Sequence, residues 1–267
     1  MRFAHFGFAL LLSLCIGTPN VIAGLIGSQI DGAEGIIEID NSNGAASFIG
    51  PVGSQFIMGL AHDSVSNTLY GSQTIQGDNL VQINPLTGVG SIIGSMGFDD
   101  VRGLAFDPNT NTLYGVQADS NSRLLQINTA TGAAAAIGFT GFSQIEGLAF
   151  DANSNTLFGI QGGGHDGLLS INAGTGAASL IGSTGFTQHH GLAFDPGTNT
   201  LFGAAGSLTD GLVSFNTSTG ESTTIGPFGF DNVRGLAFAS VSVPEPSSFV
   251  IGMAMLFAGI RSRRQPV

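Results

Sequence analysis

A period of 44 residues runs through the sequence and constrains the fold more than any other feature. Four similar segments read GLAHDSVSNTLYG, GLAFDPNTNTLYG, GLAFDANSNTLFG and GLAFDPGTNTLFG, and a fifth GLAF follows them. These five segments begin at Gly59, Gly103, Gly147, Gly191 and Gly235. Each repeat holds four short apolar stretches between turn residues, as in 103–106, 112–117, 123–128 and 133–138. Four antiparallel strands in a repeat of about 40 to 50 residues are typical of a β-propeller blade.

The two ends of the repeat region complement each other. Residues 25–50 match only the last three strands of a repeat, and residues 235–238 supply the missing first strand. A closing blade built from both ends of the chain seals a propeller and hides its edge strands. The sequence therefore predicts an all-β, five-bladed propeller of four-stranded blades over residues 24–242.

Two polar residues recur at the turns of every whole repeat. One series comprises Asp63, Asp107, Asp151 and Asp195, and the other comprises Asn84, Asn128, Asn172 and Asn216. Short Asp and Asn side chains accept hydrogen bonds from backbone amides of the next turn, so both series predict turn scaffolding. Calcium binding by the Asp series is the alternative. We expect Asp, Asn and Pro to set the backbone of these turns and Gly to supply positive φ angles.

A second set of positions, just before each Gly-Leu pair, varies between repeats. These positions hold Met58, Arg102, Glu146, His190 and Arg234. In a closed ring the five side chains would surround one mouth of the axial channel. Residues that are the same in every copy serve the scaffold, whereas polar residues that vary at a shared place are candidates for function. Arg102, Glu146, His190 and Arg234 therefore form the candidate ligand-binding rim.

The chemistry of this rim favours capture of an anion. Arg102, Arg234 and His190 are among the few cationic side chains of an acidic chain. The guanidinium fork suits carboxylates, such as those of an acidic exopolysaccharide, and a matrix protein is the other expected kind of partner. The alternative is internal salt bridging of the two arginines with Asp99, Asp100 or Asp231.

Catalysis is the alternative function. A secreted hydrolase or lyase at the channel mouth would use Glu146 and His190 as acid and base. A catalytic metal needs several converging ligands, and two fixed Arg charges in the ring disfavour a divalent cation. His165, His189 and His190 are a separate zinc or nickel candidate, although adjacent His residues on a strand point to opposite sides. The sequence shows no phosphate-cradling loop and no nucleophile elbow, so we expect no cofactor and a non-enzymatic binding function.

The N-terminus predicts export. Residues 1–23 have an early charge at Arg2, an apolar run over 6–16 and a small residue at Ala23, which is the layout of a secretory signal peptide. Cleavage after Ala23 would remove Cys15, the single cysteine of the chain. A lipoprotein site at Cys15 is the alternative.

The charge of the remaining body excludes nucleic acid as a partner. Residues 24–246 hold three Arg residues and all 18 acidic residues of the chain, so their net charge is −15. A body this acidic repels nucleic acid and anionic membrane surfaces.

Residues 243–267 predict a C-terminal tail that enters the membrane. Residues 249–260 are apolar and precede an Arg cluster, but a helix of this length covers only about 18 Å of a roughly 30 Å hydrocarbon core. Pro244, Glu245 and Pro246 stand just before the apolar stretch. This tail resembles the PEP-CTERM sorting signal of exosortase substrates. The resemblance implies recognition at these three residues and cutting by a membrane transpeptidase-like sorting enzyme.

The resemblance of the tail implies a place in the cell. A sorted protein is anchored transiently in the inner membrane and is then released, or attached at the outer surface or in a biofilm matrix. A plain tail anchor, oriented by its Arg cluster, is the alternative. The repeats resemble the Gly-Leu-Ala-Phe-Asp blades of NHL and YVTN-type propellers, which implies a fold and selects no ligand.

Overall fold

The structure is a computed structural model that describes residues 21–32, 34–53, 56–74, 77–186, 188–206 and 210–242. Residues 1–20 of the predicted signal peptide lie outside the described residues, and so does the whole predicted sorting tail, residues 243–267. Within the described ranges, no helix has the length and apolar character needed to cross a membrane.

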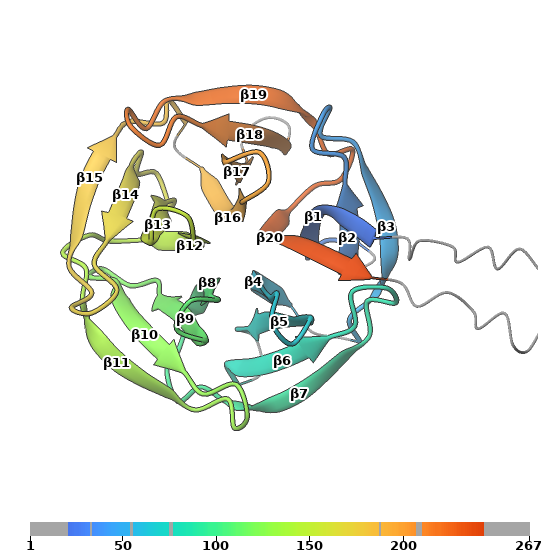
Figure 1. Cartoon of the computed structure of the whole chain (residues 1–267), viewed down its shortest axis with the longest axis horizontal. Helices are drawn as coiled ribbons and strands as arrows, with labels where there is room; N and C mark the ends of the chain where they lie inside the picture. The colour runs from blue at the N-terminus through green and yellow to red at the C-terminus, as the bar shows by residue number, and fades with distance from the viewer. Residues whose placement is uncertain are drawn as a thin grey trace, which may run out of the picture. The chain divides into compact units, whose positions relative to one another are not determined.

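Five four-stranded antiparallel sheets stand around a common axis, as Figure 1 shows, and this confirms the predicted five-bladed propeller. The innermost strands, which carry the Gly-Leu motif, are β4 (Ile57–Asp63), β8 (Val101–Asp107), β12 (Ile145–Asp151), β16 (His189–Asp195) and β20 (Val233–Ser242). The second strands are β5 (Thr68–Gln73), β9 (Thr112–Gln117), β13 (Thr156–Gln161), β17 (Thr200–Ala205) and β1 (Val21–Gln29). The third strands are β6 (Asn79–Ile83), β10 (Arg123–Ile127), β14 (Leu168–Ile171), β18 (Gly211–Phe215) and β2 (Gly35–Ile39). The outer strands are β7 (Gly90–Ser95), β11 (Ala134–Phe139), β15 (Ala178–Gly182), β19 (Ser222–Pro227) and β3 (Ala46–Pro51).

The fifth blade closes the ring with strands from both ends of the chain. Its strand order is β20-β1-β2-β3, so the last inner strand pairs with the first strand of the chain, as predicted. Ser28 on β1 ties this blade to the next one, because its hydroxyl accepts from the amide of Gly235 and donates to the carbonyl of Ile57. The inner strands are longer than the predicted stretches: β8 covers Val101–Asp107, whereas the predicted stretch covers residues 103–106.

Glycine permits the close packing of neighbouring blades. A Cβ added to Gly59 would collide with the backbone carbonyl of Arg102 on the next inner strand. The same holds on the outer strands, where a Cβ would collide with the backbone of the next blade's turn at Gly50, Gly94, Gly138, Gly182 and Gly226. These glycines recur because the backbone of one blade occupies the space that a side chain of the other would need.

The hydrophobic core lies between neighbouring blades. One cluster joins Tyr70, Leu80 and Met96 of one sheet to Leu104 and Leu125 of the next. On the third strand β10, Leu125 and Ile127 are buried while Gln126 between them is exposed, because successive side chains of a strand point to opposite faces. The ring is thus held by packing between sheets and needs no disulfide.

The two polar series act as turn scaffolds, as predicted. In each Asp turn one carboxylate oxygen accepts backbone amides and the other accepts the hydroxyl of a Ser or Thr, as with Val65, Ser66 and Asp63. Asn84 likewise accepts the amide of Leu86. In the Asp turns Asn takes a positive φ of about 55°, at Asn67, Asn111, Asn155 and Asn199. Asn tolerates this conformation because its short side chain bonds locally. Gly does supply the positive φ at the other turns, as at Gly132.

Candidate binding site at one mouth of the channel

The inner strands present two different rings of side chains at their two ends. Because alternate residues of a strand face the same way, positions two apart line the axis together. We call the first ring the polar mouth, and it consists of Met58, Arg102, Glu146, His190 and Arg234. We call the second ring the apolar mouth, and it consists of His62, Phe106, Phe150, Phe194 and Phe238.

Five leucines separate the two mouths. Each is at most 2% exposed, and they are Leu60, Leu104, Leu148, Leu192 and Leu236. The axis beside them leaves no room for a water molecule. The channel is therefore closed in its middle, and a ligand at one mouth does not reach the other.

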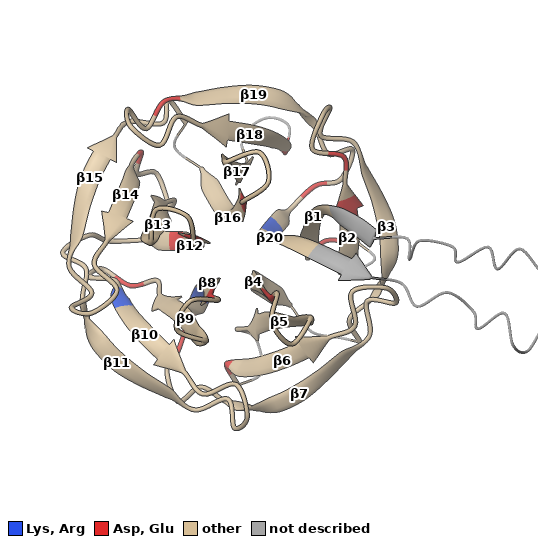
Figure 2. Ribbon diagram, viewed as in Figure 1, with Lys and Arg blue, Asp and Glu red and all other residues tan. Residues whose placement is uncertain are grey.

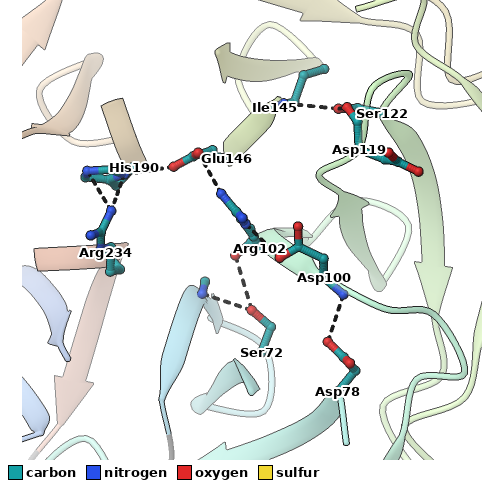
Figure 3. A network of polar contacts seen from close by, with 11 residues as sticks. Ser72, Asp78, Asp100, Arg102, Asp119, Ser122, Ile145, Glu146, His190 and Arg234 are labelled. Carbon is teal, nitrogen blue, oxygen red and sulfur yellow. Dashed lines mark hydrogen bonds and ion pairs between the residues drawn. The ribbon is translucent and has the colours of Figure 1, made fainter. Parts of the chain in front are cut away.

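A continuous chain of polar contacts crosses four blades at the polar mouth (Figure 3). Arg102 donates through Nη1 to Glu146 Oε1 at 2.7 Å and through Nε to Asp100 Oδ1 at 2.7 Å. The other oxygen of Glu146 lies 2.8 Å from His190 Nδ1. Arg234 Nη1 lies 2.7 Å from His190 Nε2. Figure 2 shows the same arrangement by charge, with blue on β8 and β20 and red on β12 near the axis.

The tautomer of His190 follows from its two partners. The guanidinium of Arg234 only donates, and it lies against both ring nitrogens at 2.7 and 2.8 Å. The Glu146 carboxylate only accepts, so His190 Nδ1 carries the proton and donates to Glu146 Oε2. His190 Nε2 then accepts from Arg234. Both ring nitrogens are engaged in this arrangement.

The two arginines of the polar mouth have different electrostatic surroundings. Burial acts to lower the pKa of Arg102, but the hydrogen bond of Asp100 and the charges of Glu146 and Asp100 outweigh it and raise the pKa. For Arg234 burial dominates, and the pKa is lowered despite the charges of Glu146 and Asp210. Burial also acts to raise the pKa of Glu146, but contacts with His190 and the charges of both arginines lower it. Glu146 is therefore a firmly ionised carboxylate.

A cavity of about 450 Å³ lies beside Arg234 at the polar mouth. Its lining residues are Asp31, Glu146, Gly163, Gln188, His190, Gly206, Asp210, Asp231, Asn232 and Arg234. Part of the room comes from Gly206, since a Cβ there would lie 2.9 Å from His190 Nε2 and 3.0 Å from Asp210 Oδ1. Reasoning from the sequence missed Asp31, Asp210 and Gly206, because they come from loops outside the varying ring.

The structure places the three histidines considered as a zinc or nickel candidate in different surroundings. His189 is fully buried, with Nε2 2.7 Å from Thr184 Oγ1, and His190 faces the axis, so the two adjacent rings do point to opposite sides. His165 lies 3.2 Å from Ser143 Oγ at the surface. Among the described residues, no group of three or more His, Cys, Asp or Glu side chains is arranged to hold a metal ion.

Comparison with known proteins supports the fold and nothing finer. No protein-family model and no curated protein matches the sequence. A chain of a nidogen/laminin complex aligns with a TM-score of 0.59 at 13% identity, covering 81% of this chain and 98% of that one. A protein of unknown function from Bacteroides thetaiotaomicron gives 0.57 at 13% identity, covering 81% and 64%. TolB from Acinetobacter baumannii gives 0.50 at 12% identity, covering 81% and 66%.

The protein is a β-propeller with five four-stranded blades. Its distinguishing feature is a polar mouth with one internally neutralised arginine, Arg102, and a second arginine, Arg234, beside a cavity.

Proposed function

We propose that the protein is an exported, non-enzymatic binding module that takes its ligand in the cavity of the polar mouth. The observation that carries this proposal is the state of Arg234. Its guanidinium lines the cavity, and among the described residues it has no carboxylate oxygen within salt-bridge distance. Its Nε is buried without a described partner. A partly buried Arg in this state can bind an anionic group by donating hydrogen bonds to it.

Arg102 contributes to the site only indirectly. It is held by Asp100 and Glu146 on two sides, so its charge is already neutralised inside the protein. The internal salt bridging considered for both arginines thus applies to Arg102 and leaves Arg234 as the anion-binding group. Glu146 and His190 then serve to position Arg234 through the contact chain.

The geometry disfavours the alternative function of a hydrolase or lyase. A general base needs a free lone pair aimed at the substrate. Both oxygens of Glu146 are engaged by Arg102 and His190, and His190 Nε2 is covered by Arg234. The pair therefore stabilises the rim and is badly placed for proton transfer.

Display outside the inner membrane is the second part of the proposal. It is supported by the signal-peptide pattern of residues 1–23 and by the resemblance of residues 243–267 to an exosortase sorting tail. The expected partners are an acidic exopolysaccharide or a matrix protein of the biofilm, and the sorting enzyme recognises Pro244, Glu245 and Pro246.

Equilibrium dialysis with mass spectrometry tests the binding function. The full chain is dialysed against conditioned medium of its host, next to Arg234→Gln and the control Arg123→Gln, whose arginine lies on β10. We expect a compound that the wild type and Arg123→Gln retain, that Arg234→Gln loses, and that is recovered chemically unchanged. Retention by Arg234→Gln, or recovery of a cleaved product, contradicts the proposal.

The intact mass of the native protein tests the sorting route. We expect loss of the tail near Pro244–Pro246 and a body at the outer surface or in the medium. In a host without the sorting enzyme the tail should stay in place. A full-length tail in the inner membrane of the normal host would show a plain anchor instead.

A further inference from the structure

The cavity of the polar mouth has walls of opposite charge. Arg234 supplies the single guanidinium among its lining residues, and Asp31, Asp210 and Asp231 supply three carboxylates. The fourth carboxylate, Glu146, is already paired with Arg102. A purely anionic ligand that reached Arg234 would meet the three aspartates, and a purely cationic ligand would meet Arg234. The charge of the cavity therefore favours a ligand that carries both signs.

Arg234 has donors to spare for an anionic group. Its Nη1 donates to His190, and its Nη2 donates to Asn232 Oδ1 at 2.7 Å. A guanidinium has five N–H groups, so three remain without an acceptor among the described residues. One is on Nη1 and one on Nη2, where a ligand can reach them, and the third is on Nε, which is buried. A carboxylate is the group whose two oxygens match such a planar set of donors.

The aspartates have acceptors to spare for a cationic group. Asp31 Oδ2 accepts from the side-chain amide of Asn232 at 3.2 Å, and Asp210 Oδ2 accepts from the backbone amide of Val233 at 3.1 Å. In each of these two carboxylates the other oxygen has no donor among the described residues. An ammonium group brings three donors and a positive charge, which are what such oxygens need.

The size and lining of the cavity restrict the ligand further. A volume of about 450 Å³ holds a small organic molecule. Every lining residue that the structure describes is charged, polar or Gly, whereas sites for drug-like or lipidic ligands are lined mainly by apolar and aromatic side chains. The ligand is therefore small and polar, without a large apolar part.

We propose that this cavity binds a small zwitterion, a molecule that carries a carboxylate on Arg234 and an ammonium group on the opposing aspartates. The inference rests on the proposed binding function and names the chemical class of its ligand. The long polymer of an acidic exopolysaccharide has only the anionic half of this pattern, and it becomes one of the outcomes of the test.

Isothermal titration calorimetry on the full chain separates the two halves of the ligand. The probes are glycine, β-alanine and 4-aminobutyrate, in which the two charges lie progressively farther apart. Acetate and methylammonium are the single-charge controls at equal ionic strength. We expect at least one zwitterion to bind about tenfold or more tightly than either control, a difference that calorimetry resolves readily.

Three variants assign the binding to the named groups. Arg234→Gln and Asp210→Asn should each weaken the zwitterion about tenfold or more, while Arg123→Gln should leave its affinity unchanged. Asn at position 210 keeps an oxygen for the Val233 amide, so this variant removes charge with little change of shape. Thermal unfolding of each variant shows that it is folded.

Three results would overturn the inference. They are no heat with any zwitterion, acetate binding as tightly as the best zwitterion, and equal weakening by Arg123→Gln. The first two leave the proposed function intact if dialysis still shows a retained ligand that depends on Arg234, such as a purely anionic polysaccharide. The proposed function itself fails only if dialysis shows no such ligand.

Discussion

The two mouths of the channel are built on the same five strands and differ in what the repeats preserve. At the apolar mouth four of five positions are Phe, and Phe106 and Phe194 are less than a tenth exposed. At the polar mouth the five positions hold four different residue types, and the four polar side chains among them bond to one another across blades. Packing tolerates little change, so the apolar mouth is uniform. At the polar mouth the side chains face an open cavity and form hydrogen bonds, so each blade can carry a different residue there.

This difference separates stability from function within one strand. On each inner strand, the residue two positions before the buried leucine lies at the polar mouth, and the residue two positions after it lies at the apolar mouth. The apolar mouth supports the ring, whereas the polar mouth faces the cavity. Substitutions at the apolar mouth should therefore act on folding, and substitutions at the polar mouth should act on binding.

The largest effect on stability is expected at the apolar mouth. Phe194→Ala should lower the free energy of unfolding by about 3–5 kcal/mol, because it removes a buried ring and leaves a cavity. Phe194→Leu keeps most of the volume and should cost less than about 1.5 kcal/mol. Urea unfolding of both variants measures these values. A loss below about 1 kcal/mol for Phe194→Ala would show that the apolar mouth is not part of the packed core.

The second effect concerns a buried histidine beside the polar mouth. His189 stands where the other blades have Ile57, Val101, Ile145 and Val233, all buried. Burial lowers the pKa of His189 from 6.5 to about 4, so the folded state excludes a proton that the unfolded state binds. Stability from this group is complete above pH 6.5 and is lost as the pH falls from 6.5 towards 4, by about 3 kcal/mol in total.

The variant His189→Val tests this pH dependence. It restores the residue type of the other blades, so it should remove the loss while carboxylate titration stays common to both proteins. Urea unfolding at a series of pH values gives the difference between wild type and variant. That difference should be flat above pH 6.5 and should grow in favour of the variant below it. Parallel curves down to pH 4 would show that His189 does not titrate on unfolding.

A smaller effect is expected at the centre of the polar contact chain. Glu146→Gln should lower the free energy of unfolding by about 1–3 kcal/mol, because Arg102 and His190 lose a buried charged acceptor. Glu38→Gln, at an exposed position on β2, is the matched control and should change stability by less than about 0.5 kcal/mol. Equal effects of the two variants in urea unfolding would show that the contact chain adds nothing to stability.

The smallest effect on stability should come from Arg234→Gln, at less than about 1 kcal/mol. Removing this half-buried charge loses its contacts with His190 and Asn232 but also removes the cost of burying it. The same variant should have the largest effect on binding. A loss of several kcal/mol in urea unfolding would show that Arg234 is a structural residue.

Much of the fold could be predicted from the sequence because the repeat displays its own register. The 44-residue period, the Gly-Leu motif and the split repeat at the two ends determine the blade number and its closure. The same comparison of copies located the polar mouth, since Arg102, Glu146, His190 and Arg234 share one structural position. Strand ends were less certain, because the inner strands continue into the variable positions that the motif does not mark.

The partners of each rim residue could not be predicted in the same way. The salt-bridge alternative named Asp100 as a partner of Arg102, which the structure bears out, but it did not name Glu146, the second partner, on the next blade. The cavity depends on Asp31 and Asp210, which reach it from loops of different blades. Such contacts are set by three-dimensional placement, so the sequence shows the candidate residues and only the structure shows which of them remain unpaired.

One experiment compares the two mouths directly. Arg234→Gln at the polar mouth and Phe194→Leu at the apolar mouth are placed in the same dialysis assay, at equal concentrations of folded protein. The account predicts that Phe194→Leu retains the ligand as the wild type does and that Arg234→Gln loses it. Loss of the ligand in Phe194→Leu with retention in Arg234→Gln would place the binding site at the apolar mouth and contradict the account.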